Sequence, residues 1–132
     1  ASAVVPLLFE EKNTATAEEI VIGSEQVFAW EWMWVEVEAA LVRRKGNSGD
    51  WNHWNQIRNR FIGVVYPDPF MDSLLAFNRQ LGLRAADAGH VYVFETLTLD
   101  LPDLQMVTFD REMAAAVKAL GLELHPDCDG VE

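Results

Sequence analysis

The chain has 132 residues, half of them hydrophobic, and a formal net charge of −11 at pH 7. This length predicts one hydrophobic core and a single domain over residues 1–132. The negative charge argues against a broad basic face that grips nucleic acid, because such binding depends on Lys and Arg displacing counterions. Two classes stay open: a metal-dependent enzyme that meets phosphate through a cation held by acids, and a binding module for a basic partner.

Helical and extended segments alternate along the chain. Helices are predicted over residues 4–11, 17–23, 34–45, 51–60, 69–81, 84–97 and 111–120. Strands are predicted over residues 25–30, 61–66, 104–109 and 122–125. Thr16 is the expected N-cap of the second helix, Gly121 is expected to end the last one, and residues 46–50 and 66–69 are expected turns. The alternation predicts an α/β fold with a parallel sheet covered on both faces, whose sites lie beyond the carboxyl ends of the strands.

The expected location of the protein is the cytoplasm. The sequence has no run of apolar residues long enough for a membrane span and no basic segment before an apolar run that would indicate a signal peptide. The single cysteine, Cys128, has no partner for an internal disulfide, which fits a reducing compartment. The acids around it in "PDCDG" are expected to raise its pKa, so that it is a poor nucleophile.

Three acids stand out by their positions. Glu36 lies in "WVEVEAALVRR", an otherwise apolar helix in which two alanines leave room around a carboxylate. Asp87 lies in the first turn of its helix, where free N–H groups and the helix dipole favour an anion. Asp110 stands between the strand "LQMVTF" and the helix "REMAAAVKAL". Each also has a structural interpretation: an N-cap for Asp110, a first-turn acid for Asp87, and an ion pair with Arg43 or another arginine for Glu36.

Together these acids predict a site for a hard cation, because Mg²⁺ and Mn²⁺ prefer oxygen ligands. The three histidines, His53, His90 and His125, share no metal-like spacing, so zinc is not expected. His90 lies one turn beyond Asp87 and is a candidate for the same pocket, with a core histidine as the alternative. The sequence contains no glycine-rich phosphate loop.

The tryptophans have two interpretations. Trp30, Trp32 and Trp34 fall within five residues of one another, and they could be stacking platforms for a ligand or residues of the core or an interface. The tryptophans and the hydrophobic half of a small chain suggest more apolar surface than one core needs. A homodimer that also binds a partner chain is therefore expected.

Four stretches, in order, resemble the motifs of PIN domains, in particular of the VapC-type toxins of bacterial and archaeal toxin–antitoxin pairs. "ASAVVPLLFEE" resembles the segment just after the first strand of that family, and "WVEVEAALVRR" resembles its second motif, a Glu followed by Ala-Leu and Arg. "LRAADAGHVYVFETL" resembles the third motif, and "LQMVTFDREMAAAVKALGLEL" resembles the fourth, in which an Asp follows Val-Thr and precedes a helix. The resemblance runs from Ala1 to about Leu124.

The resemblance implies a three-layer α/β/α sandwich with a central parallel sheet and acids that converge at one end of it. Glu36, Asp87 and Asp110 match three of the four acids that are catalytic and bind the metal in the family. Ser2 matches a small hydroxyl residue that supports these ligands, with His90 beside them. The fourth acid and the first strand of the family would precede Ala1, so the natural chain is expected to continue upstream of this residue.

The implied activity is endonucleolytic cleavage of RNA by water with Mg²⁺ or Mn²⁺, in a toxin restrained by an antitoxin whose basic tail meets the acidic cleft. One alternative is a catalytically inactive PIN-fold protein that acts as a partner-binding module. Another is an acidic structural protein in which Glu36 pairs with an arginine. The sequence upstream of Ala1 would separate the first two, because a strand ending in Asp supports the nuclease.

Overall fold

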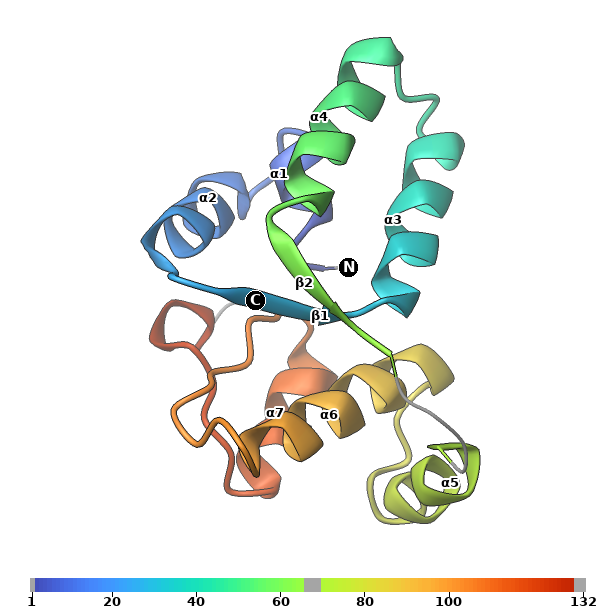
Figure 1. Cartoon of the computed structure of the whole chain (residues 1–132), viewed down its shortest axis with the longest axis vertical. Coiled ribbons are helices and arrows are strands. Elements are labelled where there is room, and N and C mark those ends of the chain that lie inside the picture. Colours follow the sequence, from blue (N-terminus) through green and yellow to red (C-terminus); the bar gives the residue numbers. More distant parts are fainter. Residues whose placement is uncertain (1, 66–69, 130–132) are drawn as a thin grey trace. The chain divides into compact units, whose positions relative to one another are not determined.

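The computed structural model describes residues 2–65 and 70–129 and shows a mixed α/β chain (Figure 1). The chain divides into two compact units, Ala1–Val64 and Val65–Glu132. Seven α-helices and a two-stranded parallel sheet lie in the described part. Within residues 2–65 and 70–129, no helix has the length and apolar character needed to cross a membrane. The turn predicted over residues 66–69 lies outside the described residues.

The first unit holds the sheet and four helices. Its elements are α1 (Val5–Leu8), α2 (Thr14–Gly23), β1 (Val27–Trp30), α3 (Trp32–Arg43), α4 (Ser48–Arg58) and β2 (Phe61–Val64). The two strands pair in parallel, as the sequence predicted, and the structure sets their register, with Val27 opposite Phe61 and Trp30 opposite Val64. Parallel neighbours need a long crossover connection, and here α3 and α4 supply it as a helical hairpin (Figure 1).

The second helix begins earlier than the sequence indicated. The prediction of Thr16 as its N-cap is wrong, because α2 starts at Thr14 with Asn13 in the N-cap position. The buried hydroxyl of Thr14 donates to the carbonyl oxygen of Pro6 at 2.7 Å, and it accepts the N–H of Glu11 at 2.8 Å. These bonds join the start of α2 to α1, which ends at Leu8 rather than at residue 11.

The fourth helix also begins before its predicted start, at Ser48 instead of residue 51. Asn47 and Asp50 form a reciprocal capping box, in which each side chain accepts the backbone N–H of the other residue at 2.9 Å. Two of the free N–H groups at the helix start are satisfied in this way. The predicted turn over residues 46–50 therefore ends at Asn47, and its last three residues are helical.

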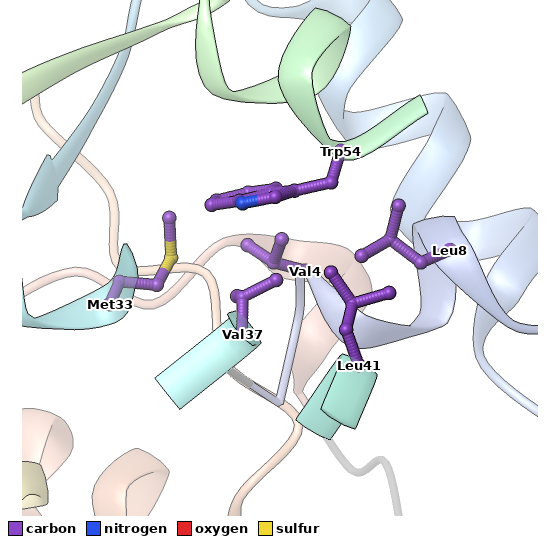
Figure 2. Packing of buried hydrophobic residues seen from close by; sticks show 6 residues of the cluster. All are labelled: Val4, Leu8, Met33, Val37, Leu41 and Trp54. Carbon is purple, nitrogen blue, oxygen red and sulfur yellow. The ribbon is translucent and has the colours of Figure 1, made fainter. Parts of the chain in front are cut away.

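The core of the first unit lies between α1, α3 and α4, as Figure 2 shows. Met33, Val37 and Leu41 are spaced four residues apart and form the buried stripe of α3. Trp54 of α4 is fully buried, with no exposed surface, and packs over this stripe. Val4 and Leu8 complete the cluster.

In its described residues, 65 and 70–129, the second unit has three α-helices and a single-turn 3₁₀ helix. These are α5 (Phe70–Leu81), α6 (Ala85–Thr98), α7 (Arg111–Ala119) and η1 (Pro126–Cys128). Its core is formed by four buried residues, Val91 and Phe94 of α6 and Met113 and Val117 of α7. The helices α6 and α7 begin and end within two residues of their predicted bounds.

The strands predicted over residues 104–109 and 122–125 are reduced to one parallel bridge between Met106 and Leu124. Two backbone hydrogen bonds form this bridge. The N–H of Met106 donates to the carbonyl oxygen of Glu123 at 2.9 Å, and the N–H of His125 donates to the carbonyl oxygen of Met106 at 2.8 Å. Residues 122–125 form no further backbone pairs with residues 104–109, because the positions on either side of Leu124 are held by other contacts. Leu122 is tied back to the end of α7, and Pro126, which has no N–H, begins the 3₁₀ helix.

Glycine ends two helices of the second unit, as predicted for Gly121. Gly121 has a φ of +72°, and its N–H donates to the carbonyl oxygen of Lys118 while Leu122 donates to Val117. This is the Schellman arrangement, which favours glycine because its left-handed backbone crowds a Cβ. Gly82, with a φ of +64°, ends α5 in a similar conformation.

Candidate functional site

Glu36 lies in the middle of α3, at the edge of the core rather than in it. The buried stripe of this helix runs through Met33 and Val37, and Glu36 is half-buried beside it. A carboxylate in this position keeps partial access to solvent, so it avoids most of the cost of a fully buried charge. The position suits either a cation ligand or an ion-paired acid, the two interpretations that the sequence left open.

Glu38, two residues further along α3, has a defined structural role. Its Oε2 atom accepts a hydrogen bond from the indole Nε1–H of Trp54 at 3.3 Å and lies 3.9 Å from Nη1 of Arg58. A fully buried indole N–H needs an acceptor, and Glu38 supplies it. The sequence could have indicated this pairing only through the general need of a buried tryptophan for a polar partner.

Asp87 lies in the first turn of α6, as predicted, and it is half-buried. The N-cap residue of this helix is Arg84, whose side chain makes no cap hydrogen bond. The helix start therefore carries positive partial charge that a carboxylate in the first turn stabilises. Ala88 and Gly89 are buried, and their small size allows the start of α6 to pack closely against its neighbours. Ala85 is exposed and takes no part in this packing.

Asp110 is the N-cap of α7, so its structural interpretation is confirmed. Its Oδ1 atom accepts the backbone N–H of Met113 at 3.0 Å. Its own N–H donates to the buried hydroxyl of Thr108 at 3.1 Å, which fixes the residue at the helix start. The sequence reasoning missed Thr108, although the Val-Thr-Phe-Asp spacing was visible. The cap uses Oδ1, which leaves Oδ2 as the candidate ligand atom.

The five candidate residues are divided between the two units. Ser2, exposed in the turn before α1, and Glu36 belong to the first, whereas Asp87, Asp110 and half-buried His90 of α6 belong to the second. Among residues 2–65 and 70–129, no group of three or more His, Cys, Asp and Glu side chains is arranged to hold a metal ion. The predicted convergence of the three carboxylates stays a prediction.

The donor chemistry of the candidate set fits a hard cation. All three acids are half-buried, so each carboxylate is held by its helix and still within reach of an ion from solvent. Carboxylate oxygens suit Mg²⁺ and Mn²⁺, and the set includes no thiolate that would favour a softer metal.

Cys128 is buried in the 3₁₀ helix and is a poor nucleophile, as predicted. Burial raises the pKa of its thiol, and the charge of neighbouring Asp127 raises it further, while a hydrogen bond with the backbone of Thr108 acts in the opposite direction. The sequence indicated the correct direction, but it attributed the shift to the nearby acids, whereas burial is the larger cause.

Comparison of the chain with protein-family models, with curated proteins and with solved structures gave no match. The resemblance to PIN domains stays a prediction that rests on the quoted motifs.

Proposed function

We propose that this chain is a metal-dependent endoribonuclease, the toxin of a toxin–antitoxin pair, which hydrolyses RNA phosphodiester bonds with Mg²⁺ or Mn²⁺. The observation that supports it is the local placement of the three acids. Each is half-buried and stands where the order of motifs predicts: within α3, in the first turn of α6, and at the start of α7 just after a parallel bridge.

In this proposal the chain forms a three-layer sandwich around a parallel sheet, and Glu36, Asp87 and Asp110 bind the cation at one end of it. Ser2 and His90 orient these ligands by hydrogen bonds. The cation, when bound, supplies positive charge for the scissile phosphate and lowers the pKa of water. A bound cation would also explain how a chain of net charge −11 can bind RNA, because the ion makes the local charge of an acidic site positive.

The proposed protein is cytoplasmic, forms a homodimer and binds an antitoxin whose tail carries basic residues. A cationic tail would compete with the metal for the same carboxylates, since arginine pairs well with them. Binding of the antitoxin would then inhibit the enzyme without any change in the fold of the toxin.

The second candidate function is a catalytically inactive PIN-fold module that binds a partner. Exposed apolar side chains on one side of α3 favour it: Trp32, Val35 and Val42 are 47, 55 and 67% exposed. Their spacing of three and seven residues places them along one stripe of the helix. Such a stripe suits a docked protein segment.

The test is an RNA cleavage assay with Mg²⁺ or Mn²⁺, with EDTA, and with the variants Asp87→Asn and Asp72→Asn. Asp72 is a matched control because it is an exposed acid in the first turn of another helix, α5. We expect Asp87→Asn to lower cleavage at least roughly tenfold, the scale seen when the surroundings of a metal site are disturbed, and Asp72→Asn to leave it unchanged. If the gene encodes residues before Ala1, the longer product is assayed in parallel.

The outcomes separate the two candidates. Metal-dependent cleavage that stops with EDTA and depends on Asp87 supports the nuclease. Equal activity in the two aspartate variants would reject Asp87 as a ligand. A well-folded chain that cuts no RNA with either metal, in the longer form as well, would favour the binding module.

A further inference from the structure

Two of the three clustered tryptophans form a pair at the surface of the first unit. The rings of Trp30, the last residue of β1, and Trp32, the first residue of α3, are stacked with centroids 5.9 Å apart and planes 24° apart. Trp32 is 47% exposed. Trp34 behaves differently, because it packs edge-on against Trp54 and Phe61 in the core. The structure thus assigns Trp34 to packing and leaves the Trp30–Trp32 pair to be explained.

The pair lies close to a candidate ligand of the cation. Trp32 and Glu36 are four residues apart in the same helix, so their side chains lie on one face, with a rise of about 6 Å between their backbones. A side chain that lies beside a ligand of the cation can also contact the part of the RNA next to the phosphate that the cation would bind. This relation depends only on α3 and not on any other part of the chain.

We propose that Trp32, supported by Trp30, is a stacking platform for a base of single-stranded RNA, next to the phosphate that the cation at Glu36 would bind. This inference rests on the proposed function and adds a substrate contact to it. A base in a single strand can leave its neighbours and stack on an aromatic side chain, which a paired base cannot do without unpairing.

The surroundings of the pair favour a base over a phosphate. Exposed Glu31 lies between the two tryptophans in sequence, and its charge repels an RNA backbone. A nucleobase is uncharged, so the charge of Glu31 does not repel it as it repels a phosphate, and a base can stack on an aromatic face. The indole of Trp32 is already held against Trp30, so little side-chain entropy is lost when a base stacks on it.

The experiment measures binding apart from cleavage. Short labelled oligoadenosine, an abasic strand of the same length, and the same oligoadenosine paired with oligouridine are titrated by fluorescence anisotropy in a Glu36→Gln background. Trp32→Leu, Trp32→Phe and Val42→Ala are then added to that background. Leucine keeps the apolar bulk but lacks an aromatic face, phenylalanine keeps a smaller face, and Val42 is an exposed residue at the other end of α3.

We expect the single strand with bases to bind more tightly than the abasic or paired strands. Trp32→Leu should weaken its binding roughly 5- to 150-fold and leave the abasic strand unaffected, the range that corresponds to losing one base stack. Trp32→Phe should keep part of the preference, and Val42→Ala all of it. Circular dichroism identifies any variant that fails to fold, and Trp32→Phe then provides the comparison.

Two results would overturn the inference: equal affinity for strands with and without bases, or equal affinity of the Trp32→Leu chain and its parent. If RNA is nevertheless cleaved with Mg²⁺ or Mn²⁺ and Asp87 is required, the proposed nuclease stands and only the stacking role fails. If Trp32→Leu and Val42→Ala both abolish homodimer formation while the base preference is unchanged, the apolar side of α3 is a protein interface and the stacking role is rejected.

Discussion

Replacing Glu38 by Ala is expected to destabilise the first unit, although the side chain is not in the core. The change removes the acceptor of the Trp54 indole N–H, which has no exposed surface. The buried donor then loses its hydrogen bond in the folded state and keeps it in the unfolded state.

The size of the effect follows from the two contacts of the carboxylate. An unsatisfied buried donor costs about 1–3 kcal/mol, and the length of this bond, 3.3 Å, places it in the lower half of that range. The Arg58 contact at 3.9 Å joins side chains that are 46 and 42% exposed, so solvent screening leaves it a few tenths of a kcal/mol at most. We expect a total loss of about 2 kcal/mol, or a drop of about 1 M in the urea midpoint.

The assay is urea unfolding followed by far-ultraviolet circular dichroism, in a double-mutant cycle with Trp54→Phe. Phenylalanine has no N–H, so removal of Glu38 should cost at least about 1 kcal/mol less in that background. Glu18→Ala, at an exposed acid of α2, is the control and should change stability by less than about 0.5 kcal/mol. An equal cost of Glu38→Ala in both backgrounds would refute the reasoning, since the hydrogen bond could not then be its cause.

Three further changes test local features of the fold by urea unfolding. Lys45 ends α3 with a φ of +55°, so Lys45→Gly should relieve that conformation and raise stability by about 0.5–1 kcal/mol, and a loss would contradict this account. The side-chain amide of Asn78 donates to the carbonyl oxygen of Leu83 at 2.8 Å and accepts its N–H at 2.9 Å, so Asn78→Ala should cost about 1–2 kcal/mol. If Asn78→Ala lowers stability no more than Gln80→Ala, a change at an exposed position, then the two Asn78 hydrogen bonds do not stabilise this turn. Burial raises the pKa of the Cys128 thiol, so above its ordinary pKa of 9.0 the unfolded chain releases the proton first, and stability falls as the pH rises toward the raised value. The natural chain should lose more stability across this range than Cys128→Ala, and equal pH profiles would show that the thiol is not protected.

Several features of this protein followed from local sequence. The apolar run predicts a helix over residues 34–45, and α3 forms at Trp32–Arg43, with Met33, Val37 and Leu41 as its buried residues. Gly121 ends α7, and Asp110 caps it, because a residue that tolerates a left-handed backbone and a side-chain acceptor are favoured at those points of a helix. Such features depend on residues a few positions apart, so the sequence carries the information directly.

Choices among similar residues were decided by tertiary structure. Thr14, rather than Thr16, organises the start of α2 because the carbonyl oxygen of Pro6 lies within reach of its hydroxyl. Glu38 and Glu36 are two residues apart in one apolar helix, and only the packing of Trp54 from α4 gives Glu38 a hydrogen bond to a core residue. The pairing of Met106 with Leu124 stops at a single bridge because the neighbouring helix end and Pro126 take the adjacent residues. Local sequence sets which backbone conformations are favourable, whereas the role of a given side chain depends on which distant atoms pack around it.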